Sequence, residues 1–371
     1  MTLILLARVA SADDAAPDPL AIQTHGFVSQ GALLTSDNNY LAHTEHGSLE
    51  FTEAGINFTK PLDDRLTVGV QLFARDLGPT GNYSAKFDWL DLDYHWKDWL
   101  GLRAGRVKIP FGLYNDTSDI DAVQPVALLP QSVYSITNRN LLLAQTGVEL
   151  YGYLPLGDAG ALDYSGYLGT LYLTLADSAA VHFTGVTVPY VTGGRVMWET
   201  PLEGLRVGAS ALDGEIDATY MLNAAPALGG MDATLVQQNY LGSIEYANNG
   251  FLLAAEYGRS HSRSTAGGAT AKVILEAMYG MASYHWRPWL QTTAYYSLSY
   301  PNVDNRSGRA NHQHDAALDL RFDITSHWLV KLEGHAMRGT AALSSDLNYG
   351  IAPADLVNVW YLLAAKTTVY F

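Results

Sequence analysis

Few side chains in this chain have the type and spacing that nucleophilic catalysis requires. The sequence has no cysteine, so it holds no thiol nucleophile and no thiolate metal ligand. It contains neither a G-x-S-x-G elbow nor a glycine-rich phosphate loop between a strand and a helix. The segment HSRS, residues 261–264, has no nearby acid that would orient a base. We therefore expect that the protein is not an enzyme.

The segment NHQH, residues 311–314, places two histidines one residue apart. Such a pair is able to ligate a metal ion through His312 and His314. The surrounding stretch is rich in Gly, Asn and Arg, which is typical of a solvated loop. We interpret both histidines as loop residues and expect no metal and no cofactor.

The charge balance excludes one broad class of function. The 371 residues include 22 Lys and Arg against 37 Asp and Glu, a formal net charge of −15. A nucleic-acid binder needs a basic face, so no nucleic-acid partner is expected. The balance favours a soluble acidic protein, or a protein whose acids line a wet surface.

Apolar and polar residues alternate with period two along nearly the whole chain, while helical periodicity is almost absent. In residues 66–75, for example, Leu66, Val68 and Val70 alternate with Thr67 and Gly69. The pattern predicts about sixteen strands, at about 23–34, 48–59, 65–76, 84–95, 99–107, 144–154, 161–173, 191–201, 204–213, 236–247, 250–261, 272–285, 289–300, 313–324, 328–339 and 357–371.

The connections between these strands alternate in length. Short turns follow every even strand, and long connections rich in Gly, Asn, Ser and Asp follow every odd strand. This rhythm predicts an all-β, antiparallel transmembrane barrel of the Gram-negative outer membrane, in contact with membrane lipid and lipopolysaccharide. Aromatic residues beside the short turns fit an interfacial girdle: Tyr94, Trp96, Trp99, Tyr284, Trp286, Trp289 and Trp328. The alternative is a soluble all-β protein.

The sequence divides into three segments. Residues 1–12 are expected to be the remnant of a signal peptide, because Ala10, Ser11 and Ala12 precede two acids as at a signal-peptidase site. The alternative for this stretch is an untidy disordered terminus. Residues 13–22 are expected to be disordered, and residues 23–371 to form the barrel. No later stretch has the roughly 18 consecutive apolar residues of a membrane helix.

The last strand, WYLLAAKTTVYF at residues 360–371, is apolar and alternating up to Phe371. An open seam would expose unpaired backbone to lipid, so the strand that closes a barrel cannot fray. Phe371 resembles the terminal aromatic residue that the barrel-assembly machinery reads in outer-membrane proteins. The resemblance implies that Phe371 is an assembly signal.

The third long connection, at about residues 108–143, is longer and more apolar than the others. A barrel of sixteen strands is too wide for wall side chains to fill, so a loop folded inward would find packing there. Sixteen strands, such a loop and a terminal Phe resemble the trimeric porins of Gram-negative bacteria over the whole mature chain. GRVKIPFGLYND, residues 105–116, is similar to the strand-to-loop segment of the phosphate-selective porins O and P.

The resemblance implies a pore constriction between charges on this loop and charges on the wall. It assigns to the loop the acids Asp116, Asp119 and Asp121, the bases Lys108 and Arg139, and polar rims at Tyr114 and Tyr134. Strand alternation points Arg75 and Arg103 toward the lumen opposite these acids, and leaves the direction of Arg106 open. The same alternation points further charges inward: Arg321, Lys331, Lys366, Asp91, Asp93, Glu149, Glu256, Asp319 and Glu333.

The implied function is a water-filled channel for passive diffusion of ions and small hydrophilic solutes. Because acids outnumber bases in the chain and in the third loop, we expect a weak preference for cations. Phosphate capture needs clustered Lys and Arg, and the loop departs from that pattern. The alternatives are an anion-specific porin of the phosphate type and a non-conducting structural or receptor barrel. A homotrimer is implied, although the second loop, at about 77–83, is short for a latch on a neighbouring subunit.

Overall fold

The computed structural model describes residues 21–173, 175, 181–224 and 229–371. The expected signal-peptide remnant, and the expected disordered segment up to residue 20, lie outside the described residues. The strands are β1 (Gln23–Thr35), β2 (Phe51–Pro61), β3 (Leu66–Leu77), β4 (Lys86–Lys97), β5 (Leu100–Lys108), β6 (Ala144–Pro155), β7 (Ala161–Thr170), β8 (Val181–Glu199), β9 (Leu205–Leu222), β10 (Met231–Asn248), β11 (Phe251–Ala266), β12 (Ala269–Arg287), β13 (Leu290–Tyr300), β14 (Gln313–Thr325), β15 (Trp328–Gly339) and β16 (Val359–Tyr370).

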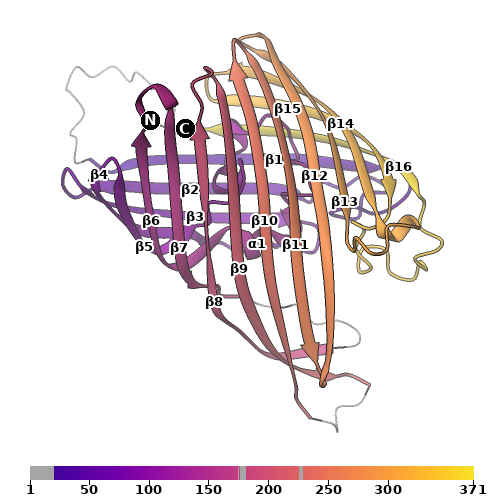
Figure 1. Cartoon of the computed structure of the whole chain (residues 1–371). Coiled ribbons are helices and arrows are strands. Elements are labelled where there is room, and N and C mark those ends of the chain that lie inside the picture. Colours follow the sequence, from indigo (N-terminus) through magenta and orange to yellow (C-terminus); the bar gives the residue numbers. More distant parts are fainter. Residues whose placement is uncertain (1–20, 174, 176–180, 225–228) are drawn as a thin grey trace.

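These strands form one closed antiparallel barrel in which each strand pairs with its neighbours in sequence (Figure 1). The seam lies between β1 and β16, which are paired from Phe27 opposite Tyr370 to Thr35 opposite Leu362. Beyond the strand end, the backbone N–H and C=O groups of Phe371 both bond to Gly26 at 3.0 Å. Closure leaves no unpaired sheet edge, as a membrane barrel requires. The prediction of a sixteen-strand antiparallel barrel is confirmed.

The ring of Phe371 also covers Gly26, because a Cβ built at Gly26 would lie 2.5 Å from the ring. We predict that Phe371→Ala slows barrel assembly, since the closing strand loses this contact, and leaves the assembled barrel unchanged in function. Heat-modifiable mobility of newly synthesised protein on gels reports folded barrel. Tyr361→Ala, which removes a similarly exposed aromatic ring near the start of β16, serves as the control. Assembly of Phe371→Ala at the normal rate would contradict the prediction.

The outer face of the barrel is apolar and the inner face is polar and charged. On β16, exposed Tyr361, Leu363 and Val369 alternate with buried Lys366 and Thr368. The expected girdle aromatics at the short-turn end are exposed on the outer face, apart from half-buried Tyr284. In the part of the chain that the structure describes, no helix is long and apolar enough to cross a membrane.

Strand length departs from the expected uniformity. β8 to β12 contain 16–19 residues, and Figure 1 shows them running well past the other strands. The prediction of a long connection after the eleventh strand is wrong. β11 and β12 are joined by the two-residue turn Gly267 and Gly268, whose φ angles are +56° and +80°. Pairing continues beyond the apolar belt with polar residues facing outward, so the end of the apolar pattern was not the end of the strand.

Candidate functional site

Residues 109–143, here called loop 3, connect β5 to β6 and contain the short helix α1 (Arg139–Leu142). Loop 3 contacts inward residues on opposite sides of the barrel. Ser210 of β9 accepts a bond from the N–H of Gly112 at 2.9 Å, and Thr293 of β13 donates to the carbonyl of Pro125 at 2.9 Å. On β3, Arg75 donates to the carbonyl of Ile136 at 3.2 Å. A segment with these partners crosses the lumen.

Asp121 fastens loop 3 to β15 and β16. Its carboxylate lies 3.0 Å from Lys331 Nζ and 3.1 Å from Lys366 Nζ, and it accepts a 2.6 Å bond from the hydroxyl of Thr368. Burial alone would raise the pKa of Asp121, but the two ammonium groups and the hydroxyl outweigh it and hold that pKa well below the ordinary range. Asp121 is therefore buried in its ionised form between the two ammonium groups.

Acids of the wall hold the neighbouring backbone of loop 3. The N–H of Ala127 donates to Asp319 at 3.2 Å and to Glu333 at 3.0 Å, and the N–H of Leu128 donates to Glu333 at 3.2 Å. Glu333 also lies 2.8 Å from Nε2 of buried His335. The inward direction predicted for Asp319, Lys331, Glu333 and Lys366 is confirmed.

Glu256 of β11 receives a second part of loop 3. Its carboxylate accepts bonds from the Leu113 N–H at 3.0 Å, from Ser243 at 2.5 Å, from Tyr279 at 2.9 Å and from the hydroxyl of Tyr134. Tyr134 Oη in turn accepts the N–H groups of Leu113 at 2.8 Å and Tyr114 at 3.2 Å. Burial and the adjacent carboxylate raise the pKa of Tyr134, so its hydroxyl stays protonated and donates.

The predicted polar rims at Tyr114 and Tyr134 are wrong. Both rings are buried, with their centroids 5.8 Å apart in an edge-to-face arrangement. They pack in an apolar cluster with Leu113 and Val126 of loop 3 and with wall residues such as Met281. Loop 3 is held by packing as well as by charge, because both its face and the facing wall carry large side chains.

The loop acids are predicted to face Arg75 and Arg103, and among the described residues none of the three forms an ion pair with either base. Asp119 pairs with Lys108 at 2.7 Å, and Asp116 pairs with Arg195 of β8 at 3.1 Å. Arg75 and Arg103 are neutralised by acids of adjacent strands instead, namely Glu53 for Arg75 and Asp93 with Glu149 for Arg103. Inward charges on adjacent strands are closer to each other than charges on opposite sides of the lumen. Strand alternation shows only that a side chain points inward, and it does not show which of these charges becomes its partner.

The remaining predicted bases have different partners. Arg139 of loop 3 pairs with Asp88 of β4 at 2.5 Å. Arg106 donates to the carbonyls of Phe87 and Asp88 and makes no bond to loop 3 among the described residues. Sequence reasoning missed Arg195, Asp88 and Glu53, although strand alternation was sufficient to point Arg195 and Glu53 inward. Asp88 lies at a register shift between β3 and β4, which alternation cannot foresee.

The lumen has a dry sector and a wet sector. In the dry sector, against β15 and β16, the side chains of Lys331 and Asp121 are 0% and 1% exposed. In the wet sector, between loop 3 and β4 to β8, the side chains of Arg103 and Asp116 are 34% and 32% exposed. Further inward side chains of the wet sector are Asp91, Asp93, Lys108, Asp163 and Arg195.

Two acids of the wet sector stand outside its ion pairs. Neither Asp91 nor Asp163 forms an ion pair within the described ranges. Both side chains are half-buried and alternate with lipid-facing leucines on β4 and β7. Asp163 lies opposite Met197 of β8, two residues from Arg195, which pairs with Asp116 of loop 3. The wet sector therefore carries more negative than positive charge.

The histidines of NHQH form no recognisable metal site. The His312 and His314 rings lie 5.1 Å apart, and His314 Nδ1 is 2.5 Å from the hydroxyl of Tyr296. Among the described residues, no group of three or more His, Cys, Asp or Glu side chains is arranged to hold a metal ion.

The closed sixteen-strand barrel, its apolar outer belt and its aromatic girdle define a multi-pass outer-membrane β-barrel. No protein-family model and no curated protein sequence matches the chain. Solved structures do. The chain is similar to the anion-selective porin from Comamonas acidovorans, with TM-score 0.60, 11% identity, and 95% of this chain and 99% of that chain covered.

Two further structures share the fold. The outer membrane channel DcaP of Acinetobacter baumannii aligns with TM-score 0.56 and 13% identity, over 94% of this chain and 97% of that chain. Salmonella typhi OmpF, in a complex with daunomycin, aligns with TM-score 0.59 and 13% identity, over 94% of this chain and 97% of that chain. At these identities the likeness establishes the fold.

Proposed function

We propose that the protein is a porin that conducts ions and small hydrophilic solutes through the wet sector of its lumen. The observation that carries the proposal is the exposure of charged side chains between loop 3 and β4 to β8, in a barrel whose opposite side is closed by buried ion pairs. Water that reaches Arg103 and Asp116 also supplies a path for ions. In this proposal Asp116, Asp119, Lys108, Arg103 and Arg195 shape the constriction, and Asp121, Arg139 and Arg75 fix loop 3 in place.

We further propose a weak preference for cations, because Asp91 and Asp163 add negative charge beside the path that no ion pair neutralises. A unit charge about 4 Å from an ion in water changes its energy by about 1 kcal/mol, so two such charges alter ion choice several-fold. Charges on the external loops contribute little, because salt screens them beyond about 8 Å.

The double variant Asp91→Asn with Asp163→Asn is expected to reduce cation preference, and Arg103→Gln is expected to raise it. The measurement is the reversal potential of purified protein in planar bilayers under a salt gradient. Asp346→Asn, in the exposed connection between β15 and β16, is the matched control and should leave the reversal potential unchanged. An anion-selective wild type would favour a specific anion porin, and absence of current would favour a structural or receptor barrel.

The partners belong to the same proposal. We propose contacts with membrane lipid and lipopolysaccharide on the outer belt, recognition of Phe371 by the barrel-assembly machinery, and a homotrimer. One structural neighbour, OmpT of Vibrio cholerae, is described in a trimer form. The connection between β3 and β4, residues 78–85, is short and turns back on itself through a bridge between Leu77 and Thr80. A trimer of this chain would therefore be held by strand faces and not by a latch at this loop.

A further inference from the structure

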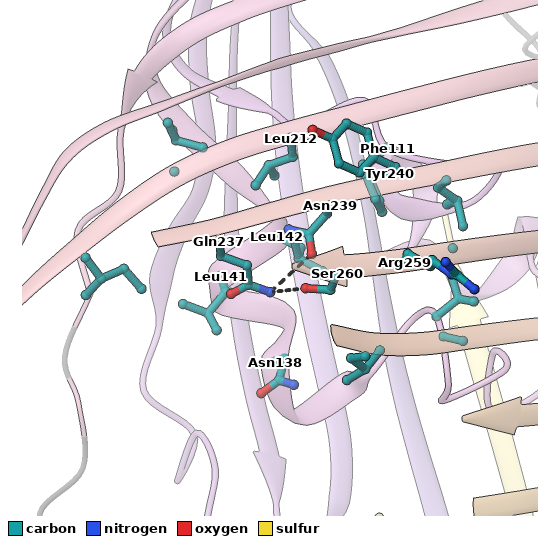
Figure 2. A pocket seen from close by; sticks show the side chains of 18 of the residues that line it. Phe111, Asn138, Leu141, Leu142, Leu212, Gln237, Asn239, Tyr240, Arg259 and Ser260 are labelled. Carbon is teal, nitrogen blue, oxygen red and sulfur yellow. Dashed lines mark hydrogen bonds between the residues drawn. The ribbon is translucent and has the colours of Figure 1, made fainter. Parts of the chain in front are cut away.

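An apolar cavity lies inside the lumen, on the external side of loop 3. Its volume is about 220 Å³, and it is bounded by Phe111 and Leu142 of loop 3 and by residues of β8 to β12 such as Leu212 (Figure 2). The interior of a pore is ordinarily polar because water fills it. A concave apolar surface with a few polar groups is the usual form of a small-molecule site.

The side chains that face the cavity carry no charge. Leu212, Ile216 and Leu241 are inward residues of β9 and β10, and Val191 of β8 joins them in one apolar cluster. Glu215 borders the cavity but alternates with inward Gly214 and Ile216, so its side chain belongs to the outer face. Arg259 also borders it. Its guanidinium bonds to Glu276 and Tyr257 on the outer face.

Polar atoms at the cavity provide one acceptor and one donor for a ligand. The side-chain amide of Gln237 donates to Asn239 Oδ1 at 3.1 Å and to Ser260 Oγ at 3.0 Å, as the dashed lines in Figure 2 mark. Both amide hydrogens are then used. Within the described chain, Gln237 Oε1 and Asn239 Nδ2 make no hydrogen bond. A neutral group that both donates and accepts, such as an amide or a hydroxyl, matches this pair.

We propose that this cavity is a binding site for small uncharged solutes that combine one aromatic ring with a short amide or hydroxyl group. A cavity of about 150 Å³ is able to hold benzene, so about 220 Å³ leaves room for a ring and one polar substituent. The apolar walls take the ring, and Gln237 and Asn239 take the polar end. A carboxylate is disfavoured, because an unpaired charge would lose its hydration without a cation to replace it.

Binding is measured by titration calorimetry on the full-length folded barrel in lipid nanodiscs, with empty nanodiscs subtracted. This readout does not depend on ion conduction, so its failure is distinguishable from failure of the proposed channel. Benzamide is expected to bind saturably. Acetamide, which keeps the amide and lacks the ring, and benzoate, which carries a charge, should each bind at least about tenfold more weakly. Equal binding of all three probes would overturn the proposal.

Gly214→Val fills the cavity from β9. A Cβ at Gly214 would make only ordinary contacts, at 3.4 Å from the carbonyl oxygen of Tyr190 and 3.6 Å from Val191. The variant should weaken benzamide binding at least about tenfold by occupying the ring position. Gly280→Val, on the exposed outer face of β12 where a Cβ meets nothing within 4 Å, is the matched control and should bind normally.

Gln237→Leu keeps the volume and removes the polar anchor, and is expected to weaken benzamide about fivefold to tenfold. Ile216→Trp fills the same cavity from another position, in case Gly214→Val does not fold. Heat-modifiable mobility confirms that each variant is folded. Unchanged benzamide binding in a folded cavity-filling variant would show that the solute does not occupy this cavity, and would overturn the proposal.

Discussion

Asp121→Asn is expected to release the part of loop 3 that lies against β15 and β16, and to enlarge the conducting path. The substitution leaves Lys331, whose side chain is 0% exposed, without its anionic partner, with only neutral acceptors such as the backbone carbonyls of residue 121 and Val126. Lys366 keeps Glu53 at 2.8 Å. Removing one partner of a buried ion pair costs roughly 3–5 kcal/mol, which here weakens docking of the loop.

Two measurements report the release: single-channel conductance, which should rise, and limited proteolysis within residues 109–143, which should accelerate. Asp346→Asn, an exposed acid, is the control for loss of one negative charge. The double variant Asp121→Asn with Lys331→Met removes the stranded ammonium and should recover part of the lost protection. If Asp121→Asn conducts and resists proteolysis as the wild type does, this ion-pair cluster does not hold the loop.

Acid should have the same effect as this substitution. The folded-state pKa of Asp121 lies below its ordinary value of 3.8, so its contribution to docking is fully present above that value. The contribution is lost progressively as the pH falls below 3.8. Conductance of the wild type is therefore expected to increase on strong acidification, and the increase should be smaller in Asp121→Asn, where this group no longer titrates.

Tyr134→Phe is expected to loosen loop 3 at its other attachment, beside β11. The hydroxyl of Tyr134 donates to the buried carboxylate of Glu256 and accepts the N–H of Tyr114 at 3.2 Å. Without it, that N–H is left without this partner in a buried setting, and Glu256 loses one of its donors. Loss of a bond to a charged group together with an unsatisfied N–H costs roughly 2–4 kcal/mol.

Open-channel current noise should increase in Tyr134→Phe, because loop 3 moves more freely when one attachment weakens. The temperature at which the barrel loses its folded gel mobility should change little, since the strand pairing is untouched. Tyr349→Phe removes a hydroxyl from an exposed tyrosine and is the control. Wild-type noise in Tyr134→Phe would mean that the apolar cluster around Leu113 and Val126 is sufficient to hold the loop.

The sequence determined the architecture of this protein by itself. Alternation of period two depends only on each residue and its neighbours, and it correctly pointed Lys331, Glu333 and Lys366 toward the lumen. The same pattern gave the number of strands and a closing strand that ends on Phe371, because a membrane barrel must pair every strand and present an apolar face to lipid. The predicted strand ends were correct where the apolar belt and the strand pairing end at the same residues.

Features about which the alternating pattern carries no information were decided only by the tertiary structure. The strands β8 to β12 continue past the apolar belt because strand pairing tolerates polar residues on the outer face there. These longer strands form one side of the cavity at Gln237. Loop 3 has no periodicity, so its sequence could not show that Asp121 reaches Lys331 and Lys366, some 210 and 245 residues further along the chain. Each acid pairs with whichever cation lies within a few ångströms, and that distance is fixed by the folding of the loop across the barrel and not by the type of residue.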